Sequence, residues 1–285
     1  MGALNMSLFQ PSQTAIIVAP NGARKTQEDH PNIPIAQQSI IDEVIACREA
    51  GAAMVHLHAR KRTGQHSLEI EDNLPLYEAL KDKVGDSILV QLTTEAVGQY
   101  SPAQQQALIR AVKPEAASFA LRELIPDESD IASASHFFHW VAEQGILSQY
   151  ILYDNHDLRR YLQWLSQGVL PNYHHHLLLV LGRYSDGQVA YPSDLITILG
   201  SQLFELDHRW AVCAFGQFEH KCLTAAMLMG ADVRVGFENN HYDNQGAIAP
   251  NNATLVSQLV ETASALNIER MTAERLKYHL TSTGS

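Results

Sequence analysis

The sequence is poor in cysteine, and the few cysteines follow no recognisable pattern. Its 285 residues include three of them, Cys47, Cys213 and Cys222. They are odd in number, widely separated and without the spacing of a metal knuckle, so they predict neither a disulfide framework nor a cysteine-bound metal. We therefore expect free thiols and a cytoplasmic protein.

Basic charge and long apolar runs are also scarce. Lysine and arginine total 20 against 31 aspartates and glutamates, which gives a net charge of -11. An acidic chain is not attracted overall to nucleic acid or to an anionic membrane, so neither is an expected partner. The chain does not open with a basic segment followed by an apolar core, and no run approaches the ~18 apolar residues of a spanning helix. Neither a signal peptide nor a membrane segment is expected.

The chain also lacks a Pro/Gly/Ser-rich linker, so the sequence indicates no boundary between domains. It instead alternates short apolar runs with longer segments of helical period. Eight βα units in one chain predict an α/β fold, a single TIM barrel over residues 1–285 with a long first βα loop near 20–35 and a short C-terminal tail. Strands are expected at 14–19, 54–59, 87–93, 116–120, 147–153, 176–181, 209–214 and 233–237. Helices are expected to begin near Ala36, Asp72, Pro102, Ala132, Asp157, Pro192, Glu219 and Asn252.

The second expected strand carries a pair of histidines. The segment from Met54 to Arg60 reads MVHLHAR, and side chains alternate along a strand, so His56 and His58 share one face. Two neutral imidazoles on one face can bind the same cation, and zinc or another divalent transition metal suits them. The alternative is that both are satisfied polar residues of the barrel interior, and two ligands alone do not decide.

A third ligand is expected from the other end of the chain. In a TIM barrel the active site lies at the C-terminal ends of the strands. The eighth strand neighbours the first, and the second follows, so Glu238 can converge with His56 and His58. Two histidines and one carboxylate leave coordination positions open, which is the pattern of a catalytic metal site.

Five segments in order along the chain carry a resemblance to a known family. They are NGA at 21–23, HLHAR at 56–60, QLTT at 91–94, KPEA at 113–116 and RVGFENN at 234–240. Together they resemble the β-keto acid cleavage enzyme family. The resemblance implies a zinc-dependent TIM barrel, usually a homotetramer, that converts a β-keto acid and acetyl-CoA into acetoacetate and a new acyl-CoA. A metal with open positions suits this chemistry, because it can bind both oxygens of a β-keto acid and stabilise the enolate between them.

The resemblance also implies roles for individual residues. Arg234 matches the arginine of the family's catalytic dyad, and Thr93 and Ser118 match hydroxyl positions that line its substrate pocket. The alternative for Thr93 and Ser118 is hydrogen bonding to strand-end backbone groups, and the alternative for Arg234 is an ion pair within the barrel. The residues that match the family's metal ligands are His56, His58 and Glu238.

The sequence departs from the family pattern at two sites. Asn239 stands where the family has the aspartate of the catalytic dyad, and an amide cannot act as a general base. Glu95 is the first substitute expected for that base and Asp154 the second, although Glu95 could equally pair with an arginine. Arg24 stands where a typical member of the family uses a glutamate to hold its substrate's amino group, so a substrate tail with a second carboxylate or a neutral polar group is expected. An internal ion pair with Glu95 is the alternative for Arg24.

Two other features of the sequence and two alternative functions bear on the prediction. The His174–His176 tract begins the sixth strand and is expected at the barrel end away from the chemistry. Glycines 182 and 216 end the sixth and seventh strands, where barrels often hold phosphate, which would suit coenzyme A. An aldolase-type lyase that needs a metal but no thioester is the alternative enzyme. A barrel that binds a keto acid or metal without turnover is the alternative outside catalysis.

Overall fold

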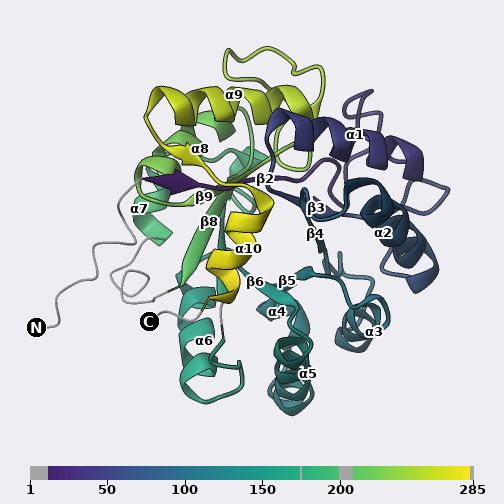
Figure 1. The fold of residues 1–285 in the computed structure, drawn as a ribbon. Coiled ribbons are helices and arrows are strands. Elements are labelled where there is room, and N and C mark those ends of the chain that lie inside the picture. The colour runs from purple at the N-terminus through teal and green to yellow at the C-terminus, as the bar shows by residue number, and fades with distance from the viewer. Residues whose placement is uncertain (1–11, 174, 199–207, 283–285) are drawn as a thin grey trace, which may run out of the picture.

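A closed barrel of parallel strands forms the centre of the protein (Figure 1). In the computed structural model, residues 12–173, 175–198 and 208–282 are described. Each barrel strand pairs in parallel with the next, and the last pairs with the first through Ile17 and Arg234. The TIM-barrel prediction is therefore confirmed. The barrel strands are β2 (Ile16–Val18), β3 (Met54–Leu57), β4 (Leu89–Leu92), β5 (Ala116–Ala120), β6 (Leu147–Leu152), β7 (His175–Leu181), β8 (Arg209–Ala214) and β9 (Asp232–Val235).

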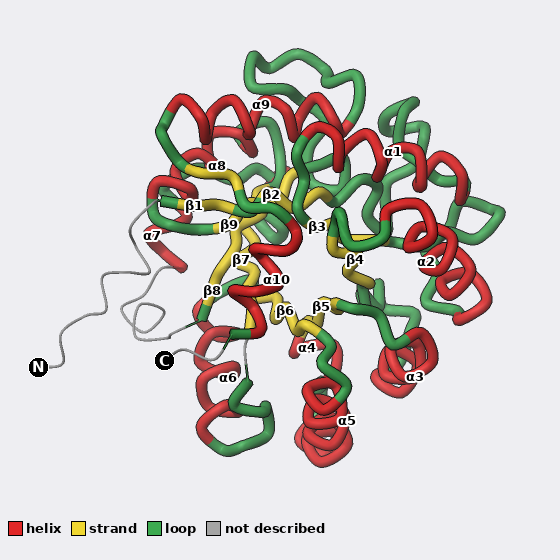
Figure 2. The backbone as a smooth tube through the Cα atoms, viewed as in Figure 1, coloured by secondary structure: helices red, strands yellow, loops and turns green. Residues whose placement is uncertain are grey.

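Helices surround the barrel, as the ribbon and the tube both show (Figures 1 and 2). All eight expected helices are present, and each begins within two residues of its expected position. None of the described helices has the length and apolar character to cross a membrane. The helices are α1 (Gln37–Ala50), α2 (Ile70–Val84), α3 (Pro102–Val112), α4 (Leu121–Leu124), α5 (Ile131–Glu143), α6 (Asn155–Ser166), α7 (Asp194–Ile198), α8 (Glu219–Leu228), α9 (Asn252–Ala265) and α10 (Ala273–Thr281), with 3-10 turns η2 (Glu128–Asp130) and η3 (Asp186–Gln188).

Alternation along the strands divides the core in two. On β3, Val55 and Leu57 belong to the large apolar cluster between the barrel and its helices. Met54 belongs to a second cluster, which fills the barrel interior together with Leu89 and Ala116. Since His56 lies two residues after Met54, its side chain also enters the interior. Every second residue of a strand therefore faces the interior. These apolar residues lie where their strands begin, and polar residues such as His56 lie nearer the C-terminal ends.

The C-terminal segment covers the end of the barrel at which the strands begin. Strand β10 (Glu269–Arg270) pairs with β1 (Gln13–Thr14) outside the barrel, and α10 follows. Leu276 and Leu280 of α10 are buried in the same cluster as the interior barrel residues. Figure 1 shows this yellow helix lying across the open end of the barrel. The expected C-terminal tail therefore contains a helix that closes the barrel at the end opposite the polar C-terminal strand ends.

Candidate active site

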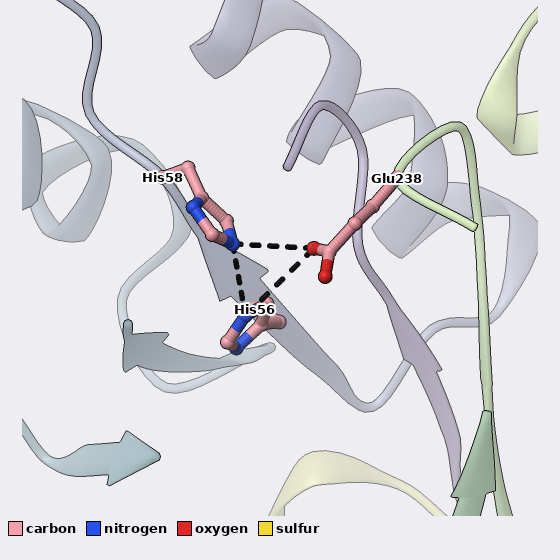
Figure 3. Close-up of side chains that lie close together, drawn as sticks. All are labelled: His56, His58 and Glu238. Atoms are coloured by element: carbon pink, nitrogen blue, oxygen red, sulfur yellow. Dashed lines mark hydrogen bonds and ion pairs between the residues drawn. The ribbon is translucent and has the colours of Figure 1, made fainter. Parts of the chain in front are cut away.

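Three predicted metal ligands meet above the barrel interior. His56 and His58 come from β3 and the residues that follow it, and Glu238 comes from the loop after β9 (Figure 3). The two Nε2 atoms are 3.0 Å apart, and Oε2 of Glu238 lies 3.2 Å from Nε2 of His58 and 3.8 Å from Nε2 of His56. Ligand atoms on one tetrahedral zinc ion lie about 3.3 Å apart, since the bonds are roughly 2.0–2.1 Å long. The spacing fits a shared metal ion.

Hydrogen bonding also fits a cation at this point. Oε2 of Glu238 is buried and receives no hydrogen bond from any residue that the structure describes. Its nearest neighbours are the two imidazole Nε2 atoms, and one divalent cation would satisfy all three atoms. A second group with ligand spacing consists of Asp154, His156 and Asp157. Its proximity follows from the helix start, because Asp154 accepts hydrogen bonds from two backbone amides in the first turn of α6.

Two glycines make this convergence possible. Gly22 has φ +62°, and a Cβ added there would lie 2.5 Å from Cγ of Glu238. Gly236 has φ +140°, and its Cβ would lie 2.4 Å from the carbonyl oxygen of Ala19. Both backbone conformations favour glycine, and both close approaches exclude a larger residue. The NGA and RVGFENN segments therefore have a steric reason for their glycines.

The electrostatics of the three residues suit metal ligation. Burial lowers the pKa of His56 to about 4 and that of His58 to about 3, so both imidazoles are neutral at pH 7, as ligands must be. Burial opposes ionisation of Glu238, but the charge of Arg234 is the largest opposing influence, and the pKa of Glu238 lies well below the ordinary value. The site therefore offers two neutral nitrogens and one carboxylate.

Arg234 lies beside these ligands. It is on β9, only 3% exposed, and its guanidinium donates to Oε1 of Glu238 at 3.0 Å and to Sγ of Cys213 at 3.4 Å. The ion pair considered from sequence is therefore present, and its partner is Glu238. Arg234 also lines a cavity beside these ligands, whose lining includes Tyr153 and Phe215, so its charge faces any molecule bound there.

Glu95 lines the same cavity between two arginines. Its Oε1 lies 3.7 Å from Arg183 and 3.9 Å from Arg24. Burial, with the nearby charge of Glu238, raises the pKa of Glu95 to about 7, and the two arginines only partly counter this. The Arg24 side chain is 59% exposed. The internal pair of Arg24 and Glu95 is thus present at long range, at the solvent side of the cavity.

The predicted hydroxyls and Asn239 occupy different surroundings. Thr93 lines the cavity, while its Oγ1 accepts a hydrogen bond from the backbone of Glu95. Ser118 is buried in β5 and does not belong to the cavity lining. Asn239 is buried in the loop after β9, outside that lining, and its side-chain amide has no hydrogen-bond partner among the described residues. The structure thus brings Thr93 to the cavity, whereas Ser118 and Asn239 are buried outside its lining.

The remaining sequence candidates lie away from the ligands. Asp154 caps α6, pairs with Arg122 and lines a neighbouring cavity. His174 falls outside the described residues, while His175 and His176 begin β7. As expected, both lie at the end of the barrel away from the C-terminal strand ends. The side chain of His176 enters the barrel, whereas that of His175 packs against Tyr150 and Tyr161 between the barrel and its helices.

Three further residues belong to the site. Lys25 lies in the long first βα loop and Tyr153 ends the fifth expected strand, so both stand where the barrel prediction puts the active site, whereas His66 had no clear signal in the sequence. Lys25 lines the cavity and donates to the carbonyl of Phe237 at 2.9 Å, and burial lowers its pKa. Tyr153 lines both cavities. The ring of His66 lies 5.2 Å from that of His58, and its Nε2 contacts the carbonyl of Glu95. His66 is positioned by an antiparallel bridge with Arg60, and no short sequence motif predicts this bridge.

Solved structures share the fold. ObcA in its apo form superposes with a TM-score of 0.68 at 17% identity, over 88% of this chain and 65% of that one, so the chain spans about two thirds of ObcA. A type I 3-dehydroquinate dehydratase from Clostridium difficile gives a TM-score of 0.58 at 10% identity, over 90% of this chain and 93% of that one. At these identities the likeness shows the barrel alone.

Sequence comparison is more specific. A 3-keto-5-aminohexanoate cleavage enzyme of Acetoanaerobium sticklandii is 28% identical over 249 residues, 85% of this chain and 88% of that protein. A 3,5-dioxohexanoate:acetyl-CoA acetone transferase of Paraburkholderia graminis is 22% identical, over 89% of this chain and 91% of its own. The profile described as beta-keto acid cleavage enzyme matches residues 13–281. The chain therefore belongs to the β-keto acid cleavage enzyme family.

Proposed function

We propose that this protein is a metal-dependent enzyme that converts a β-keto acid and acetyl-CoA into acetoacetate and a new acyl-CoA. The observation that carries the proposal is the convergence of His56, His58 and Glu238 beside a cavity that Arg234 and Glu95 also line. Family membership and the keto acid and acetyl-CoA in the name of one relative support it. Zinc is the proposed ion, because two imidazoles and a carboxylate suit it.

The bound metal would supply Lewis acidity toward the oxygens of the β-keto acid. Within the same cavity, the guanidinium of Arg234 offers a fixed positive charge to an oxyanion formed during acyl transfer. It is held in place by Glu238 and Cys213, so no reorganisation is needed when that charge appears. We assign Arg234 this stabilising role.

Glu95 is the proposed general base. Asn239 cannot take up a proton, and Glu95 combines a place in the cavity lining with a pKa of about 7. It would accept a proton from the carbon between the two carbonyl groups of the substrate. Acyl transfer returns that proton to the acetoacetate formed, so the overall reaction neither gains nor loses protons.

The substrate tail is proposed to meet Arg24 and Arg183. Both guanidinium groups lie within 4 Å of Glu95, so a tail carboxylate or a neutral acceptor would find donors there. An ammonium tail would meet two positive charges. We also propose that coenzyme A uses the adjoining cavity, because Tyr153 and Arg183 line both cavities. Thr93 is proposed to contact the substrate, since it lines the cavity, and the same role is proposed for Ser118 on the family pattern alone.

The direct test is acetoacetate formation from a panel of β-keto acids, with and without acetyl-CoA, using metal-stripped and zinc-loaded protein. The proposal expects product only when both acetyl-CoA and metal are present. Cleavage without the thioester would favour the lyase alternative. Ligand binding without turnover in the zinc-loaded protein would favour a non-catalytic barrel. We further propose a cytoplasmic homotetramer, which light scattering of the purified protein would check.

A further inference from the structure

A line of buried polar side chains runs through the barrel from the candidate metal site to the opposite end. Nδ1 of His56 lies 2.7 Å from Oε1 of Gln91, and Nε2 of Gln91 donates to Oε1 of Gln149 at 3.2 Å. Nε2 of Gln149 lies 2.9 Å from Nδ1 of His176, and Nε2 of His176 lies 3.1 Å from Oδ2 of Asp232. All five residues are at most 2% exposed.

The line crosses five barrel strands at interior positions. His56 and Gln91 are register partners on β3 and β4, and Gln149 and His176 are register partners on β6 and β7. Between the two glutamines lies β5, whose interior residue at the register of Gln91 is Ala116. The small side chain leaves room for the two amides to meet. The contacts therefore depend on strand register and not on flexible loops.

Asp232 fixes the far end of the line. Its carboxylate accepts two hydrogen bonds from Arg209, both at 2.6 Å, and one from the backbone of Ala15 at 2.7 Å. Although burial opposes ionisation, the charge of Arg209 and the contact with His176 hold the pKa of Asp232 below its ordinary value. Asp232 is therefore an anion, and an anion can only accept.

The orientations of the two amides set the direction of every contact in the line. Nε2 of Gln149 donates to Nδ1 of His176, so the ring proton of His176 lies on Nε2, facing Asp232. Gln149 then presents its oxygen to Gln91, and Gln91 presents its oxygen to His56. His56 must donate from Nδ1. Its lone pair is left on Nε2, the atom that faces His58 and Glu238.

We propose that Gln91, Gln149, His176 and Asp232 are positioning residues that hold His56 in its Nδ1–H tautomer. This inference rests on the proposed metal site, since it gives the purpose of the tautomer: a free Nε2 for the ion. A neutral imidazole can carry its proton on either nitrogen, and a metal ligand whose other nitrogen donates to a fixed acceptor is oriented and more basic. Here the acceptor is itself oriented from across the barrel.

The test is a change in the middle of the line. Gln149→Met removes both contacts and keeps the volume, so zinc should bind about 10-fold more weakly, at the lower end of the range for an outer partner of a ligand. Gln149→Glu is the rescue variant, because a buried protonated carboxyl offers one acceptor and one donor in the same sense as the amide. It should restore most of the affinity. Zinc affinity would be measured by competition with a chelator.

The matched control is Gln105→Met. Gln105 is a fully buried glutamine on α3, and its Nε2 donates to the carbonyl of Glu123 at 3.4 Å, which is not part of the line. It undergoes the same chemical change and should keep the wild-type zinc affinity even if its melting temperature falls. Equal zinc affinity in Gln149→Met, Gln105→Met and the wild type would overturn the proposal. A loss that Gln149→Glu fails to restore would also overturn it.

A second readout does not depend on metal. In metal-free protein with nitrogen-15 in its histidine rings, the proton of His56 should reside on Nδ1, and in Gln149→Met it should distribute over both nitrogens. The His56 signals are assigned by their loss in His56→Asn. A wild-type protein that binds no zinc would overturn the proposed metal site. The spectrum would still test whether the buried polar side chains hold the tautomer of His56. An unchanged tautomer in Gln149→Met would overturn the positioning role.

Discussion

Replacing Glu95 with glutamine should make the protein less active and more stable at the same time. Glu95 has a pKa of about 7 in the folded protein against an ordinary 4.5. The folded state thus binds this proton more tightly than the unfolded state, so stability falls as pH rises from 4.5 to 7. A difference of 2.5 units corresponds to roughly 3 kcal/mol.

The expected stability difference between Glu95→Gln and the wild type therefore depends on pH. Below about pH 4.5 both side chains are neutral, and the two proteins should be of similar stability. Above pH 7 the variant escapes the cost of the buried charge and should gain on the order of 3 kcal/mol. Urea unfolding at pH 4.5 and pH 8 measures both values. Glu143→Gln at the exposed end of α5 is the control for loss of one negative charge.

Activity should move in the opposite direction. If Glu95 is the base, Glu95→Gln should lower kcat about 100-fold or more, the usual contribution of a positioned base. The wild-type kcat/KM should rise with pH through an apparent pKa near 7, and that limb should vanish in the variant. Near-normal turnover would refute the catalytic role. A stability gain equal at pH 4.5 and pH 8 would refute the buried charge.

Four other changes test the site. Gly22→Ala should destabilise the fold by about 1–3 kcal/mol, because φ is +62° and the new Cβ would meet Glu238. The melting temperature and the zinc affinity should fall together, and an unchanged zinc affinity would contradict this prediction. Arg234→Met should lower kcat about 100- to 1,000-fold with an intact fold by circular dichroism, and a change confined to KM would contradict the stabilising role. Arg24→Glu should shift preference toward ammonium tails relative to Arg24→Gln, and an unchanged ranking of tails would end the selectivity role. A chelator should abolish turnover and zinc should restore it, whereas full activity after metal removal would contradict the metal role.

The fold followed from the sequence because one signal repeats. Buried strands alternate with helical periods, and caps or first-turn prolines such as Ser101 and Pro102 mark where helices begin. The meeting of His56, His58 and Glu238 was predictable for a related reason, since a closed barrel brings the ends of strands two and eight together. Barrel closure alone was enough for this prediction, without knowledge of individual side-chain contacts.

Other parts depend on contacts that a sequence does not display. The alternation rule places Gln149 and His176 inside the barrel, but which amide meets which ring depends on register and on the small Ala116 between them. The pKa of Glu95 depends on burial and on the charge of Glu238, far away in the chain. The helix α4 follows β5 with no loop between them, which leaves no turn residues to mark its start.

The central claim is acyl exchange between a β-keto acid and acetyl-CoA, and isotope position tests it most directly. The zinc-loaded protein would be given an unlabelled β-keto acid and acetyl-CoA carrying carbon-13 in both acetyl carbons. The account predicts acetoacetate labelled at C3 and C4 and unlabelled at C1 and C2, with the substrate's acyl group recovered on coenzyme A. Unlabelled cleavage products formed at the same rate without acetyl-CoA would contradict it.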